Sequence, residues 1–144
     1  MEGTPVEILL AEDNPGDVAL TRRALRESKV HNNLHVVVDG EEAMRFLHQK
    51  GEHTNAPRPD LVLLDINMPK KTGLEVLADV KSEEDLCTIP VCMLTTSEDD
   101  QDILSAYARH ANAFVKKPVD LEQFIEVVRK IEDFWFTIVK LPKE

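Results

Sequence analysis

Short apolar runs that alternate with longer amphipathic segments constrain the fold of this chain more than any other feature. Four of these runs are almost continuous and the second alternates less cleanly; they are residues 6–11, 34–38, 61–64, 91–94 and 113–115. Continuous apolar runs are typical of strands that are covered on both faces. The intervening segments combine apolar residues at helical spacing with a charged side, at 15–29, 40–50, 73–82, 98–110 and 121–140. The alternation predicts an α/β fold, a doubly wound five-stranded parallel sheet with helices on both sides.

Capping residues mark the starts of the predicted helices. Asn14 precedes Pro15, which suits an N-cap followed by a proline at the first helical position. Pairs that match or approximate a capping box are Asp39 with Glu42, Thr72 with Glu75 and Asp120 with Gln123. The segment 51–59 is polar and carries two prolines, which predicts a surface loop.

Length and composition exclude several classes of function. A chain of 144 residues has the usual size of one domain, so we expect one unit over 1–144, with its core at about 5–140 and no output domain. Its 27 acidic and 17 basic residues give a net charge of −10, which argues against nucleic-acid binding. No stretch approaches the roughly 20 apolar residues of a membrane span. Cys87 and Cys92 lack zinc-ligand spacing, and no signal peptide is present, so we expect a cytoplasmic protein with free thiols.

Residues with chemical capability follow four of the predicted strands. Glu12 and Asp13 follow the first strand, and Asp65 follows the run at 61–64. Thr95 and Lys117 follow the last two runs. Because ligands bind beyond the carboxyl ends of strands in an open parallel sheet, we expect these side chains to form one site.

This set of side chains suits phosphoryl transfer. Three carboxylates at one edge repel one another, and oxygen ligands without Cys or His favour Mg²⁺ as the neutralising cation. The Asp65 carboxylate can act as a nucleophile and form an acyl phosphate. Lys117 and the Thr95 hydroxyl can contact the phosphate oxygens. Each residue alone also fits a cap or a solvated side chain, but their joint arrangement favours a functional site.

These residues resemble the signature of the response-regulator receiver domain over about residues 5–140. The resemblance is carried by Glu12-Asp13, by Asp65 followed by Met68-Pro69 and Gly73, by Thr95, and by Lys117-Pro118. It implies a flavodoxin-like sheet of order 2-1-3-4-5 and a signalling protein, not an enzyme, that takes a phosphoryl group on Asp65 from a sensor histidine kinase or phosphotransfer protein. It also implies that Mg²⁺ is held by Asp13, Asp65 and the backbone carbonyl of Asn67, with Glu12 acting largely through a metal-bound water.

The resemblance assigns switch and tuning positions as well. The family couples its threonine, here Thr95, to an aromatic residue, here Phe114, although Phe114 can equally be an ordinary core residue. Asn67 and Ser97 occupy the two positions that tune the hydrolysis of the acyl phosphate in this family, and Thr96 stands where the family often has Ala or Gly, so that it could narrow access to Asp65. The resemblance therefore implies an intermediate lifetime of the acyl phosphate, with a slow autodephosphorylation.

Softer features resemble the small single-domain regulators that pair with bacterial phytochrome kinases. They are Asn14-Pro15, Pro69-Lys70-Lys71, Leu94 to Ser97, Phe134-Trp135-Phe136 and Leu141-Pro142. That group implies a homodimer through the segment 98–110, the strand at 113–115 and the segment 121–140. Independently, the last segment has an apolar stripe that core packing does not require, formed by Val127, Ile131, Phe134 and Ile138.

Two other functions stay open at this point. An aspartyl-phosphate phosphatase of similar fold needs a second acid two residues after its nucleophile, and Asn67 stands there. A binding module that is never phosphorylated has no need of the intact set of Asp13, Asp65, Thr95 and Lys117.

Overall fold

The elements of the fold follow the predicted alternation of strands and helices. The computed structural model describes residues 5–27, 31–95, 110–111, 113–117 and 122–123. The elements in these ranges are β1 (Val6–Ala11), α1 (Pro15–Glu27), β2 (Asn32–Val37), α2 (Gly40–His48), the short 3₁₀ helix η1 (Gly51–His53), β3 (Leu61–Asp65), α3 (Gly73–Ser82), β4 (Val91–Thr95) and β5 (Ala113–Lys116). All five predicted strands and the first three predicted helices are therefore confirmed. The helices predicted at 98–110 and 121–140 lie outside the described residues, apart from residues 110, 122 and 123.

The strands form one parallel sheet in the order β2-β1-β3-β4-β5, which confirms the flavodoxin-like prediction. The register pairs Ala11 of β1 with Val37 of β2 and with Leu64 of β3. On the other side of β3, Asp65 pairs with Leu94 of β4. The carboxyl ends of these strands therefore lie side by side, at the edge where the chain leaves the sheet toward the helices.

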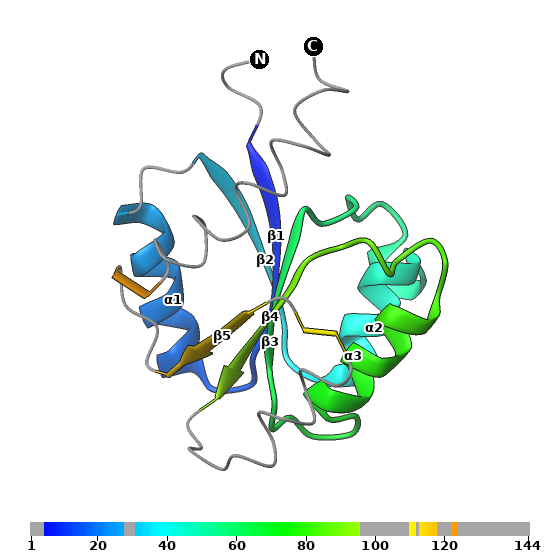
Figure 1. Ribbon diagram of the computed structural model, residues 1–144. Coiled ribbons are helices and arrows are strands. Elements are labelled where there is room, and N and C mark those ends of the chain that lie inside the picture. Colours follow the sequence, from blue (N-terminus) through cyan, green and yellow to red (C-terminus); the bar gives the residue numbers. More distant parts are fainter. Residues whose placement is uncertain (1–4, 28–30, 96–109, 112, 118–121, 124–144) are drawn as a thin grey trace.

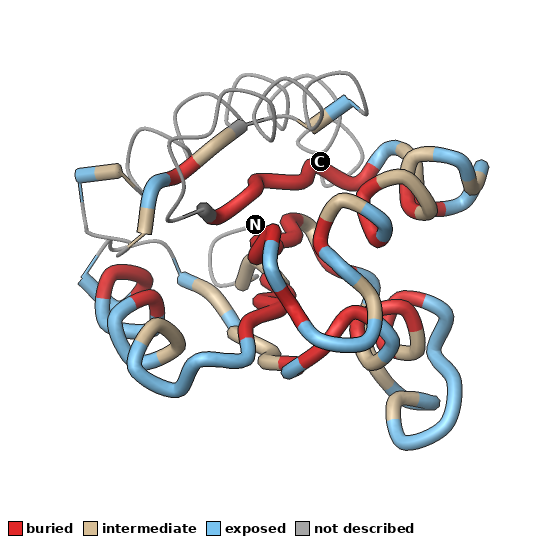
Figure 2. Tube along the Cα trace, turned by 90° about the horizontal axis from the view of Figure 1, so that it is seen from below, coloured by how far each residue is buried: buried red, intermediate tan, exposed pale blue. Residues whose placement is uncertain are grey.

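Both faces of the sheet are covered, which explains why the strands are apolar without alternation. Figure 1 shows α1 on one side of the sheet and α2 with α3 on the other. Ile8 and Leu10 of β1 belong to the core on the α1 side, together with Leu25. Leu9, between them in sequence, belongs to the core on the other side, together with Val76 of α3. Figure 2 shows the buried strands in the interior and the exposed outer surfaces of the helices.

Two helix starts have the predicted caps. Asn14 Oδ1 accepts a hydrogen bond from Asp17 N at 3.0 Å, at the start of α1. Thr72 and Glu75 form a complete capping box at α3, in which Glu75 N donates to Thr72 Oγ1 at 3.2 Å and Thr72 N donates to Glu75 Oε1 at 2.9 Å. These bonds satisfy backbone N–H groups that the first turn of a helix leaves without partners.

The cap of α2 and the start of β2 differ from the prediction. Asp39 Oδ1 accepts from Glu42 N at 2.7 Å as expected, but Glu42 Oε1 accepts from Val38 N at 2.9 Å and not from Asp39 N. Strand β2 begins at Asn32 and not at residue 34, because it pairs with β1 from Val6 onward. Backbone pairing at the edge of a sheet does not require apolar side chains. The prediction relied on apolar runs, so it did not include the polar first residues of this strand.

The remaining local predictions have mixed outcomes. The segment 51–59 is a surface connection as predicted, but it opens with η1. Of the third capping pair, Asp120 lies outside the described residues, and Gln123 Oε1 accepts a hydrogen bond from Lys116 N at 3.0 Å.

Candidate functional site

Three carboxylates meet at the carboxyl edge of the sheet, where the sequence predicts them. Glu12 and Asp13 continue β1, and Asp65 ends the neighbouring strand β3. One carboxylate oxygen from each residue lies within 4.8 Å of the others. Glu12 is 1% exposed and Asp65 is 4% exposed, whereas Asp13 is exposed. Two buried acids and one solvent-facing acid thus share a small volume.

Lys117, directly after β5, places its ammonium group among these acids. Its Nζ lies 2.9 Å from Glu12 Oε1, 3.0 Å from Asp17 Oδ2 and 3.3 Å from Asp65 Oδ2. Burial opposes the charge of this lysine, but the hydrogen bonds to Glu12 and Asp17 outweigh burial and hold the pKa of Lys117 above its usual range. The site therefore contains a permanent positive charge.

The positive charge of Lys117 does not fully neutralise the carboxylates of the cluster. Burial raises the pKa of Glu12, and the neighbouring Asp65 carboxylate adds to the rise, so that it reaches about 7 even though Lys117 acts in the opposite direction. Glu12 Oε2 also accepts a hydrogen bond from Asn14 N at 3.1 Å. Burial therefore disfavours the ionised form of Glu12, and a cation bound at the cluster would favour that form.

The loop after Asp65 is closed at its base by backbone contacts. Asn67 N donates to Asp65 Oδ1 at 3.3 Å, and Gly73 N donates to Ile66 O at 2.9 Å. A Cβ atom on Gly73 would lie 2.1 Å from Asp65 O, so the first residue of α3 touches the end of β3 directly. Only glycine allows this approach.

Two further predicted site residues lie on neighbouring strands. Thr95 is the last residue of β4, one position beyond Leu94, which pairs with Asp65. Phe114 lies in β5 opposite Met93, is half-buried, and packs against the core on the α2–α3 side. The side chain of Thr95 and the whole of Thr96 and Ser97 lie outside the described part of the chain.

Asp17 is a contact of the site that the sequence reasoning missed. It lies in the first turn of α1, where its carboxylate pairs with Lys117. The sequence contained a clue to this contact: the cap at Asn14 fixes the start of α1 and so places Asp17 at the same edge of the sheet as the three acids.

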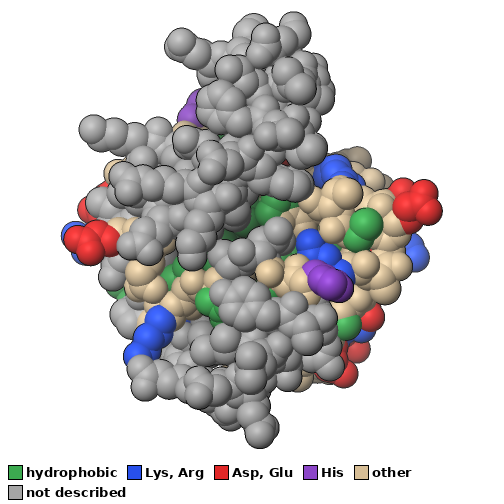
Figure 3. Space-filling view, in the orientation of Figure 1, with side chains coloured by type: hydrophobic (Ala, Val, Ile, Leu, Met, Phe, Trp, Pro, Cys, Tyr) green, Lys and Arg blue, Asp and Glu red, His purple; other side chains and the backbone are tan. Residues whose placement is uncertain are grey.

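Few large apolar side chains are exposed in the described part of the chain. Among the described residues, the exposed large apolar side chains are Leu20, at 43%, and Val38, at 53%. Figure 3 shows hydrophobic side chains in small separate areas of one face, with charged side chains around them. No helix within the described ranges has the length and apolar character of a membrane span. The predicted stripe on the last segment (Val127, Ile131, Phe134 and Ile138) falls outside those ranges.

Known proteins share this fold and much of this sequence. The family model of the response regulator receiver domain matches residues 8–129. Response regulator Rcp1 of Synechocystis sp. is 44% identical over 138 residues, which cover 96% of this chain and 94% of Rcp1. The crystal structure of the Mn²⁺-bound form of Rcp1 matches with a TM-score of 0.77 at 44% identity, over 94% of this chain and 97% of that one. The crystal structure of the phosphorylated cyanobacterial phytochrome response regulator RcpA matches with a TM-score of 0.79 at 46% identity, over 92% and 95% of the two chains.

Proposed function

The chain belongs to the response regulator receiver family, and we propose that Asp65 is the residue on which it accepts a phosphoryl group. It is a signalling protein, a response regulator of a two-component phosphorelay. The observation that carries the assignment of Asp65 is its position at the end of β3, buried, beside Lys117 and within one cluster with Glu12 and Asp13.

The Asp65 carboxylate suits nucleophilic attack on phosphorus. One of its oxygens forms the new O–P bond while the N–P bond of a phosphohistidine breaks, and the electron pair of that bond goes to the imidazole nitrogen. Lys117 Nζ, 3.3 Å from Asp65 Oδ2, supplies positive charge beside the incoming phosphoryl oxygens. Positioning and charge neutralisation of this kind are the main requirements of phosphoryl transfer.

The acidic cluster has the donor set of a Mg²⁺ site. Asp13, Asp65 and the backbone carbonyl of Asn67 would hold the ion, with Glu12 acting largely through a metal-bound water. These are oxygen donors, and the carboxylate oxygens lie within 4.8 Å of one another. When bound, Mg²⁺ neutralises charge on the phosphoryl oxygens.

The proposal extends to the switch and to the lifetime of the acyl phosphate. Thr95 ends the strand next to Asp65, so its movement toward the phosphoryl group would leave space into which Phe114 turns. Asn67, Thr96 and Ser97 tune a slow autodephosphorylation. The face that changes is formed by β5 with the segments 98–110 and 121–140, and it mediates a homodimer through Val127, Ile131, Phe134 and Ile138.

The proposed phosphodonor is a sensor histidine kinase of the phytochrome type, or a phosphotransfer protein. The likeness to RcpA, a phytochrome response regulator, supports this choice. The proposed location is the cytoplasm, with which the free thiols of Cys87 and Cys92 agree.

The alternative functions have weaker support. A phosphatase that turns over external substrates needs an acid two residues after its nucleophile, and Asn67 stands there. A purely binding module would have no use for a buried lysine that pairs with both Glu12 and Asp65.

Intact-mass measurement tests the proposal. The chain is incubated with acetyl phosphate, with and without Mg²⁺, and a gain of one phosphoryl group is expected only with Mg²⁺. Asp65→Asn should not gain mass, whereas the control Asp85→Asn, at an exposed position, should behave as wild type. A wild-type chain that gains no phosphoryl group would overturn the proposal, and steady phosphate release from many small substrates would favour a phosphatase.

A further inference from the structure

One residue in the turn that follows Asp65 has a backbone conformation that side chains disfavour. Lys71 N donates to Pro69 O at 2.7 Å, which closes a three-residue γ-turn around Lys70. Lys70 has a φ of 68°, in the left-handed region that residues with a side chain rarely adopt. Such a residue stays in this conformation only when its surroundings hold it there. The contacts of Lys70 must therefore hold it in this conformation.

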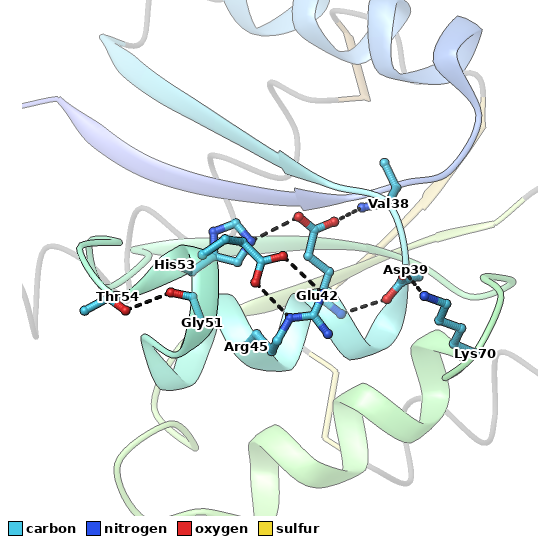
Figure 4. A network of polar contacts seen from close by, with 9 residues as sticks. Val38, Asp39, Glu42, Arg45, Gly51, His53, Thr54 and Lys70 are labelled. Carbon is cyan, nitrogen blue, oxygen red and sulfur yellow. Dashed lines mark hydrogen bonds and ion pairs between the residues drawn. The ribbon is translucent and has the colours of Figure 1, made fainter.

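One of these contacts comes from Asp39, at the N-terminus of α2. Asp39 is 6% exposed, and its two carboxylate oxygens have different partners. Oδ1 accepts from Glu42 N at 2.7 Å and caps the helix, while Oδ2 lies 3.6 Å from Lys70 Nζ. Figure 4 shows Asp39 between the start of α2 and the Lys70 side chain. One buried carboxylate thus joins the helix to the strained residue.

The turn also contacts both helices of this face at Lys71. A Cβ atom on Gly40 would lie 2.0 Å from Lys71 O, so the start of α2 and the turn touch without a side chain between them. Lys71 Nζ forms an ion pair with Asp79 of α3. The turn therefore contacts α2 at both Lys70 and Lys71, and α3 at Lys71.

The same loop carries the groups that surround Asp65. The hydrogen bond between Gly73 N and Ile66 O closes its base, and Met68 is buried within it at 7% exposure. Asn67, which is close to the turn in sequence, donates from its backbone N to Asp65 Oδ1 at 3.3 Å. If Lys70 relaxes from its positive φ, the peptide groups on either side of it rotate. Because the loop is short and closed at its base, this rotation also shifts the backbone of Asn67.

We propose that Asp39 is a positioning residue for phosphoryl acceptance. By pairing with Lys70 it keeps the γ-turn formed, and the turn holds the Asn67 peptide groups where Asp65 and its metal ion need them. The inference rests on the proposed function of Asp65. Asp39 acts through the turn and does not touch the reacting atoms. Because the Asn67 carbonyl is a proposed Mg²⁺ ligand, Asp39 should affect Mg²⁺ binding before any phosphorylation occurs.

Calorimetric titration of MgCl₂ into the unphosphorylated full chain tests this inference. Asp39→Asn keeps the helix cap, because asparagine caps a helix as well as aspartate, but removes the charge that pairs with Lys70. The expected result is up to about fivefold weaker Mg²⁺ binding, because the lost ion pair involves a lysine side chain that is 59% exposed. Glu27→Gln is the matched control, since it makes the same change of charge, breaks an exposed ion pair with Arg23 within α1, and should bind Mg²⁺ as wild type.

Two double variants separate the turn from a general effect of charge. Asp39→Asn/Lys70→Gly and Asp39→Asn/Lys70→Met both restore the net charge of the wild-type chain. Only glycine adopts a positive φ without strain, so Mg²⁺ affinity should recover in the glycine variant and stay low in the methionine variant. In EDTA, the unfolding temperature of Asp39→Asn should fall by only a few degrees, because its cap remains and the lost ion pair with an exposed lysine contributes little to stability.

Three results would overturn the positioning role of Asp39. They are an unchanged Mg²⁺ affinity in Asp39→Asn, equal recovery in the two double variants, and no recovery in the glycine variant. If the wild-type chain still gains a phosphoryl group in those cases, the proposed function stands and only this inference fails. A wild-type chain that accepts no phosphoryl group would instead remove the function on which the inference rests.

Discussion

Replacing Gly73 by alanine should disturb the contact between α3 and the strand end that carries Asp65. The added Cβ would lie 2.1 Å from Asp65 O and 2.9 Å from Ile66 Cα, whereas ordinary van der Waals contacts begin at 3.4 Å. Both neighbours are backbone atoms, which cannot rotate away. The start of α3 must therefore move away from β3, and the hydrogen bond from Gly73 N to Ile66 O weakens.

The expected loss of stability follows from three contributions. Overpacking of a close contact costs about 1–3 kcal/mol. Loss of the backbone hydrogen bond costs about 0.5–1.5 kcal/mol, and the better helix propensity of alanine offsets up to about 1 kcal/mol. The free energy of unfolding should fall by about 2–3 kcal/mol. Phosphorylation by acetyl phosphate should also slow, because the displaced backbone belongs to Asp65 and Ile66.

Urea unfolding followed by circular dichroism measures this loss as a lower midpoint with an unchanged slope. Gly16→Ala is the matched control, because its Cβ would meet Asn14 Oδ1, the end of a rotatable side chain, at 3.2 Å. That variant should stay within about 1 kcal/mol of wild type. A wild-type midpoint for Gly73→Ala, or equal losses in the two variants, would refute the steric reasoning.

Three further predictions concern charge and metal. Lys117→Met leaves buried carboxylates without their cation, so urea unfolding in EDTA should show a loss of about 3–5 kcal/mol, and wild-type stability would contradict the role of this ion pair. Burial opposes the ionised form of Glu7, but hydrogen bonds from His35 and Asn33 hold the pKa of Glu7 below its usual 4.5. Its ionised form therefore stabilises the fold above pH 4.5, so Glu7→Gln should lower the free energy of unfolding there by less than about 1 kcal/mol. This loss of stability should vanish as the pH falls through the lowered pKa of Glu7, and a loss that does not change with pH would argue against the linkage. Mg²⁺ at 100 times its Kd should stabilise the wild-type chain by about 2.7 kcal/mol in calorimetric unfolding, and an equal gain in Asp13→Asn would count against that ligand.

Much of the fold and of the candidate site could be predicted because both depend on local patterns joined by one geometric rule. Strand β1 and helix α3 have the predicted bounds, since the apolar run of β1 lies within the strand and the capping box of α3 lies at the start of the helix. Asp65 and Lys117 are far apart in the chain, but parallel strands bring their carboxyl ends to one edge. Asp17 was missed because its cap signal was used for the helix and not for the site.

By itself, the sequence determined the α/β class, the covered sheet and the set of acids with one lysine at its edge. Only the tertiary structure decided how the loop after Asp65 is held. Gly16 and Gly73 are the same residue in the first turns of two helices, yet a Cβ meets a rotatable side chain at one and a backbone carbonyl at the other. Likewise, no local pattern pairs Asp39 with Lys70. The packing of α2 and α3 against the sheet creates these contacts, because it sets which backbone segments approach one another.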